Sequence, residues 1–73
     1  MDEAPIPIRV TVNGAPQEIP PALTIDGLLS RFGLDRRHTA VERNRLLVPR
    51  ASFEATVVED GDVLEIVTLV GGG

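Results

Sequence analysis

The sequence has 73 residues, which predicts one small domain that buries only about 60% of its unfolded surface and is marginally stable. It contains no cysteine, so neither a disulfide nor a cysteine-ligated zinc ion can reinforce the fold. The net charge of −4 and the absence of Tyr and Trp argue against nucleic-acid binding. The lack of a signal peptide and of an apolar run of about 18 residues predicts a cytoplasmic protein without a membrane segment.

Residues 5–19 predict two strands joined by a tight turn. From Pro5 onward apolar and other residues alternate, which is typical of a half-buried strand with Ile6, Ile8, Val10 and Val12 on one side. Asn13-Gly14 follows, and this pair favours a hairpin turn with positive φ at both positions. The returning strand, Ala15 to Ile19, ends at Pro20-Pro21.

A short helix is predicted next, with Thr24 as its N-cap. Gly33 occupies the position where a left-handed residue ends a helix, and Leu34 is its hydrophobic partner. Gly27 inside the helix costs about 1 kcal/mol relative to Ala, which predicts a close approach of another group there. The stripe that should face the core consists of Ile25, Leu28, Leu29 and Phe32.

The second half of the chain predicts further strands. Thr39 to Asn44 forms a strand with Val41 inward, and a turn at Asn44-Arg45 leads into Leu46 to Val48. Ala51 to Ala55 predicts one helical turn, with Ser52 as its cap and Phe53 inserted into the core.

A turn over Glu59 to Asp62, with Gly61 at positive φ, then leads into a final strand from Val63 to Val70.

Two strands, a helix and further strands predict an α+β domain of the β-grasp, ubiquitin-like type. We expect a mixed sheet of four to five strands with the helix packed across one face and the last strand parallel to the first. Residues 1–70 form this single domain, and residues 71–73 form a flexible tail of three glycines. The tail adds nothing to the core, and its distinctive group is the carboxylate of Gly73 on a slim arm.

Several short motifs in this order resemble the ThiS family, the sulfur-carrier proteins of thiamine biosynthesis. They are Val12-Asn13-Gly14, Leu28-Leu29, Ala40-Val41-Glu42-Arg43-Asn44, Leu47-Val48-Pro49-Arg50, Glu59-Asp60-Gly61-Asp62 and Glu65-Ile66-Val67 through the terminal glycines. Each motif alone is weak, but their order over nearly the whole chain is specific. The chain departs from the shared pattern in having three terminal glycines instead of two, which makes Gly71 an extra spacer.

The resemblance implies a monomeric protein co-substrate and not an enzyme. A ubiquitin-activating-like adenylyltransferase would use ATP and magnesium to adenylate the carboxylate of Gly73, while Gly71 and Gly72 thread into its active site. A persulfide sulfur donor would then replace AMP and leave a thiocarboxylate, which delivers sulfur to thiazole synthase. The carrier itself would hold no permanent cofactor.

The final strand also predicts a docking surface. If Leu64 and Ile66 face the helix, then Val63, Val67 and Leu69 lie on the opposite face, with Val70 and Leu47 as further contributors. An apolar patch on a face that should meet water favours a partner-binding surface. The alternative is a strand buried on both faces.

Other polar residues favour structural roles. His38 lies in a loop beside Arg36 and Arg37 and is interpreted as solvated. Asp60 and Asp62 lack the further oxygen ligands that calcium requires, so we interpret them as turn residues and predict no metal site. The arginines at positions 43, 45 and 50 either cluster on one edge to meet an acidic partner or are scattered surface charge.

Three other functions remain open on the residues alone. The same chemistry would serve the small subunit of molybdopterin synthase, or a carrier for cysteine synthesis or tRNA thiolation. A ubiquitin-like modifier would join its terminus to a lysine of another protein. A non-catalytic interaction domain with an idle tail would do neither.

Overall fold

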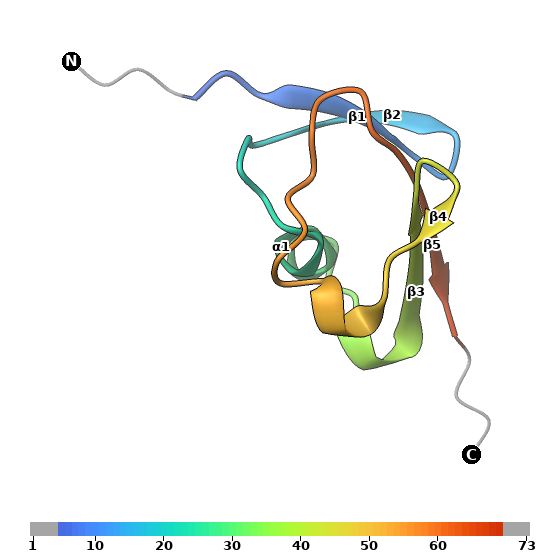
Figure 1. Ribbon diagram of the computed structural model, residues 1–73. Coiled ribbons are helices and arrows are strands. Elements are labelled where there is room, and N and C mark those ends of the chain that lie inside the picture. Colours follow the sequence, from blue (N-terminus) through green and yellow to red (C-terminus); the bar gives the residue numbers. More distant parts are fainter. Residues whose placement is uncertain (1–4, 70–73) are drawn as a thin grey trace.

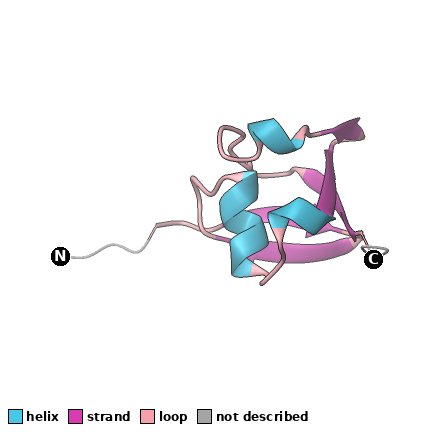
Figure 2. Ribbon diagram, turned by 90° about the horizontal axis from the view of Figure 1, so that it is seen from below, coloured by secondary structure: helices cyan, strands magenta, loops and turns pink. Residues whose placement is uncertain are grey.

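The computed structural model describes residues 5–69, in which a five-stranded mixed sheet curves around one α-helix (Figure 1). The strands follow the order β2-β1-β5-β3-β4 across the sheet. Their bounds, with that of the helix, are β1 Ile8–Val12, β2 Ala15–Ile19, α1 Ile25–Arg31, β3 Thr39–Arg43, β4 Leu46–Leu47 and β5 Val63–Thr68. Two 3₁₀ turns, Arg36–His38 and Arg50–Ser52, lie on the same side of the sheet as α1 (Figure 2).

The pairing of β5 places the last strand in the middle of the sheet. It runs parallel to β1, with Thr11 opposite Val63, and antiparallel to β3, with Thr39 opposite Thr68. Strands β2 and β4 form the two edges and are antiparallel to β1 and β3. This arrangement confirms the predicted α+β, β-grasp architecture. Among residues 5–69, no helix has the length and hydropathy that a bilayer crossing requires.

Both predicted hairpin turns are present, and the positive φ expected for Asn13-Gly14 occurs in Asn44-Arg45 as well. Asn13 and Gly14 adopt φ of 51° and 84°, and Asn44 and Arg45 adopt 53° and 72°. Positive φ at both central residues matches the right-handed twist of the flanking strands, which is why Asn and Gly suit these turns. The strand predicted from Thr39 therefore ends at Arg43, one residue earlier than expected, because Asn44 already belongs to the turn.

The two ends of α1 follow the predicted capping pattern. The Thr24 hydroxyl accepts a hydrogen bond from the Gly27 N–H at 3.0 Å, and Gly33 adopts φ of 73°. A Cβ atom on Gly27 would lie 3.1 Å from Leu23 Cδ1, which confirms the predicted close approach. The placement of Phe32 in the core was wrong. It is exposed because the chain turns back at Gly33, and Leu34 packs against the core instead.

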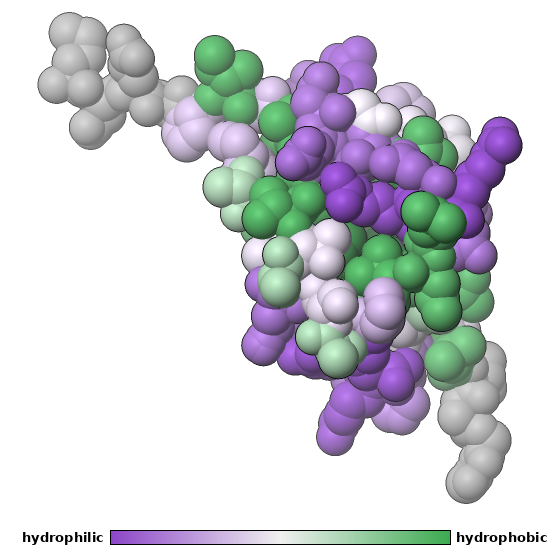
Figure 3. All heavy atoms as spheres, viewed as in Figure 1, coloured by the Kyte–Doolittle hydropathy of each residue, from purple (hydrophilic) through white to green (hydrophobic). Residues whose placement is uncertain are grey.

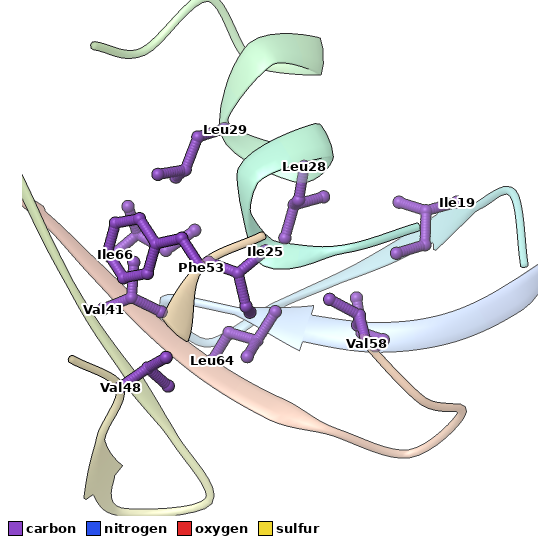
Figure 4. Packing of buried hydrophobic residues seen from close by; sticks show 11 residues of the cluster. Ile19, Ile25, Leu28, Leu29, Val41, Val48, Phe53, Val58, Leu64 and Ile66 are labelled. Atoms are coloured by element: carbon purple, nitrogen blue, oxygen red, sulfur yellow. The ribbon is translucent and has the colours of Figure 1, made fainter. Parts of the chain in front are cut away.

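A mainly aliphatic core lies between the sheet and α1, with Phe53 near Ile66 and Val41 (Figure 4). Its buried members are Val10, Ile19, Ile25, Leu28, Leu29, Val41, Val48, Phe53, Val58, Leu64 and Ile66. Ile6 is not among them, although the alternation predicted it. Because β2 ends at Ile19, opposite Ile8, no strand pairs with residues 5–7, and Ile6 stays exposed.

Two further predictions need correction. Ser52 does not cap a helical turn, because it is the last residue of a 3₁₀ turn that follows Pro49 and has no side-chain cap. The last strand ends at Thr68 and not at Val70. Its partner β3 begins at Thr39, opposite Thr68, so Leu69 has no strand beside it, and Val70 lies outside the described residues.

Candidate functional site

Alternation along β5 separates a buried face from an exposed apolar one. Leu64 and Ile66 point into the core, whereas Val63, Val67 and Leu69 are 46%, 55% and 46% exposed. The predicted division of this strand between two faces is therefore confirmed, and burial on both faces is excluded. Its use as a docking surface stays a prediction.

Leu47 on the edge strand β4 belongs to the same outer face and is 68% exposed. A depression of about 230 Å³ joins it to Val67, with Ala40, Glu42 and Glu65 as the other outer-face lining residues. We call Leu47, Val63, Val67 and Leu69 the apolar patch. Figure 3 shows hydrophobic side chains along the edge of the molecule over β4 and the end of β5.

Two residues of this face were missed by the sequence interpretation. Glu42 and Glu65 lie directly opposite each other on β3 and β5, in the row that begins with Leu47 on β4. Period two along the last strand already places Glu65 between Val63 and Val67, but only the strand register brings Glu42 beside it.

The end of β5, from which the glycines continue, is held from both sides. The Asn13 amide donates to the Ile66 carbonyl at 3.0 Å and accepts from the Ile66 N–H at 2.8 Å. One step beyond the strand, the Leu69 N–H donates to the His38 carbonyl at 2.6 Å. The predicted threading and attachment residues, Gly71, Gly72 and Gly73, lie outside the described residues, as does Val70.

The turn before β5 is organised around the buried carboxylate of Asp62. It accepts hydrogen bonds from Arg43 Nε at 2.8 Å, Asn44 Nδ2 at 3.2 Å and the Glu59 N–H at 2.8 Å. Partial burial alone would raise the pKa of Asp62, but these three donors outweigh it and hold the pKa below its usual value.

Asp60 has a separate structural task, since its carboxylate accepts the Arg9 N–H at 2.8 Å. The interpretation of both aspartates as turn residues is therefore confirmed. Within residues 5–69 no group of three or more metal-ligating side chains is present.

The loop beside the end of β5 carries a local charge network. Asp35 accepts two side-chain hydrogen bonds and one backbone hydrogen bond from Arg37, and the side-chain bonding is the main cause that lowers the pKa of Asp35 to about 2. His38 is exposed and lies 3.3 Å from the same carboxylate, Nδ1 to Oδ2. The histidine thus belongs to a surface network.

Arg43 and Arg50 make contacts in different places. Arg43 pairs with Asp62 at the turn before β5, whereas Arg50 Nε donates to the carbonyl of Arg36 at 2.9 Å. Both side chains thus bond within the fold, at separate positions, and a contact of Arg43, Arg45 and Arg50 with an acidic partner stays a prediction.

Comparison with known proteins identifies the relatives of this chain. The ThiS family model matches residues 10–73. The chain is 38% identical over 50 residues to a sulfur carrier protein ThiS of Bacillus subtilis, which covers 68% of this chain and 76% of that protein. It is also 41% identical over 66 residues to a thiazole synthase of Paramagnetospirillum magneticum, which covers 90% of this chain but only 20% of that protein.

Among solved structures, the thiamine biosynthesis protein ThiS of Geobacter metallireducens superimposes with a TM-score of 0.77 at 35% identity. This match covers 90% of the chain and 100% of that structure. The present chain thus covers the whole of that solved structure and spans about a fifth of the thiazole synthase that it matches.

Proposed function

The chain belongs to the ThiS family of sulfur carriers of thiamine biosynthesis, and we propose that the carboxyl group of Gly73 is the group that carries the sulfur. The observation that carries this proposal is the extent of the family match, which runs to residue 73 and includes all three glycines. A carrier of this kind is consumed and regenerated by other enzymes, so catalysis is expected from its partners.

The proposed chemistry starts with activation, because a carboxylate is a poor electrophile. An adenylyltransferase lets the carboxylate oxygen of Gly73 attack the α-phosphorus of ATP, with magnesium on the phosphates, and pyrophosphate leaves. The terminal sulfur of a cysteine persulfide then attacks the acyl carbon and displaces AMP. A second thiolate then attacks the cysteine sulfur of the resulting acyl disulfide and forms a disulfide with that cysteine, while the acyl-bound sulfur leaves as the thiocarboxylate, an anionic sulfur nucleophile.

Glycine suits the arm that enters an enclosed site, because a narrow channel has room for the backbone but not for Cβ atoms. Three residues span at most about 10 Å. The partner must therefore bind close to the end of β5, and the apolar patch supplies a surface there. Val67 and Leu69 immediately precede the arm, and both side chains are about half exposed.

Thiazole synthase is the proposed acceptor of the sulfur. Two thiazole synthases contain a segment that is 41% and 35% identical to this chain over 66 residues. A carrier-like segment within the polypeptide of such an enzyme supports the pairing of the two functions. The match to the ThiS model also favours the thiamine pathway over molybdopterin synthesis and over protein modification.

Intact-mass measurement tests the proposal. The purified chain is incubated with the candidate adenylyltransferase, ATP, magnesium and a persulfide donor. Exchange of the terminal oxygen for sulfur increases the mass by about 16 Da, and a variant without Gly72 and Gly73 should show no increase. Thiazole synthase should then remove the added mass in the presence of its other substrates. An unchanged mass in the wild-type chain, or conjugates to other proteins, would refute sulfur transfer.

A further inference from the structure

The apolar patch surrounds two carboxylates that the fold places side by side. Glu42 on β3 and Glu65 on β5 are register partners, and both are exposed on the outer face. Directly opposed residues on neighbouring antiparallel strands have Cβ atoms about 4.5–5.5 Å apart, so two like charges there destabilise the free sheet. Leu47 and Val67 flank the pair, and together they line one depression.

The domain does not neutralise this pair. In the part of the chain that the structure describes, neither Glu42 nor Glu65 has a basic atom within 4.0 Å. Arg9 pairs with Glu18, and Arg43 pairs with Asp62. The repulsion therefore persists in the isolated carrier, on the face that also exposes its apolar side chains.

A single guanidinium group would relieve that repulsion best. Arginine presents five N–H donors in a planar fork and can bond two carboxylates at once, whereas an ammonium ion is a compact, strongly hydrated point charge. The guanidinium is also more weakly hydrated, which suits a site with apolar neighbours such as Leu47 and Val67.

We propose that Glu42 and Glu65 together bind one arginine side chain of the adenylyltransferase when that enzyme covers the apolar patch. This rests on the proposed function. It assigns a specific polar contact to the centre of an apolar interface, where the contact sets orientation as well as affinity. A second copy of this chain is a poor occupant of the same face, because two copies face to face would bring four carboxylates together.

The experiment measures binding and stability in the same variants. Glu42→Gln and Glu65→Gln remove one charge each with little change in shape, and Glu59→Gln is the matched control on an exposed turn away from the outer face. Binding of the full-length chains to the adenylyltransferase that gives the mass increase is measured by calorimetry over a range of NaCl concentrations, and Tm is measured for each chain alone.

We expect Kd to rise about tenfold for Glu42→Gln and for Glu65→Gln, and to change less than about twofold for Glu59→Gln. The dependence of Kd on salt should weaken in the first two variants only. Their Tm should equal or exceed that of the wild type, because the like-charge repulsion is gone.

Unchanged Kd in both variants, with wild-type activation intact, would overturn this inference alone. A loss of affinity that accompanies a fall in Tm would overturn it too, since the glutamates would then be structural. Dimerisation of the wild-type chain through this face would contradict the assigned occupant. Failure of the wild-type chain to bind or to be activated would refute the proposed function together with this inference.

Discussion

Replacing Asn13 by glycine tests how firmly the end of β5 is held in the sheet. The Asn13 amide makes two hydrogen bonds to the backbone of Ile66, at 3.0 and 2.8 Å, where the main-chain pairing of β1 with β5 has ended. Glycine accepts the φ of 51° at this position, so the substitution removes the amide without adding backbone strain. Each lost bond is worth about 1 kcal/mol net, and we expect a total loss of about 2 kcal/mol in the free energy of unfolding.

For a domain of this size, that loss corresponds to a fall in Tm of about 10 °C. Urea unfolding gives the free energy, and amide hydrogen exchange should show faster exchange at Ile66. Arg45→Gly is the matched control, because Arg45 occupies the other hairpin with φ of 72° and relief of its left-handed backbone offsets the entropy cost of glycine. If Asn13→Gly unfolds at the same urea concentration as the wild type, the side chain does not hold β5.

Three further changes probe the patch, the turn and the core. Val67→Glu should abolish adenylation while leaving Tm within a few degrees of that of the wild type. Val57→Glu is the control, because it changes an exposed valine of a different segment, and this variant should be adenylated normally. Adenylation of Val67→Glu at the wild-type rate would show that the patch is not used. Because the pKa of Asp62 is lowered in the folded state, the contribution of its carboxylate to the stability of the fold is present above about pH 4 and is lost as the pH falls through the folded-state pKa. Asp62→Asn should therefore be less stable than the wild type at pH 7 by about 1–3 kcal/mol, and it should lose less stability on acidification. Urea titrations at pH 7 and pH 3 measure both effects. Phe53→Ala removes the largest buried side chain and should cost about 3–5 kcal/mol, which circular dichroism would register as an unfolded or barely folded domain.

Local sequence signals were sufficient for most of the elements. Alternation identified β1 and β5, and the bounds predicted for the returning strand, Ala15 to Ile19, match β2. Thr24 and Gly33 marked the ends of the helix because capping depends on neighbours within a few residues. The two inward residues of β5, Leu64 and Ile66, followed from period two and identified the outer face of that strand.

Features that depend on distant residues could not be predicted in this way. Asn13 was read as a turn residue, but its amide also bonds Ile66, 53 residues away in sequence. Asp62 was read as part of a tight turn, whereas its carboxylate gathers donors from β3 and from the following hairpin. Because register and tertiary packing set these contacts, they have no periodic signature in the sequence.

The outer face shows the same division between local and distant information. The apolar side chains of the last strand were predicted from alternation, and the structure confirms that they are exposed. The opposition of Glu42 and Glu65 needed the pairing of β3 with β5, which fixes which residues share a row. The exposed apolar side chains depend on one strand and could be predicted from its sequence, whereas the opposed glutamates depend on the pairing of two strands and could not.

The central position of β5 would allow the proposed docking and the proposed delivery to be coupled without a conformational change. An edge strand is bonded along one side only, whereas β5 is paired with β1 and β3 and is tied by Asn13 beyond the point where β1 ends. Val63 and Val67 of the patch are side chains of this same strand, and Leu69 follows it directly. A partner that binds the patch therefore contacts β5 itself, the strand that precedes the glycines in the sequence. Because the proposed arm spans at most about 10 Å, small errors in the placement of β5 would move Gly73 out of reach of an active site.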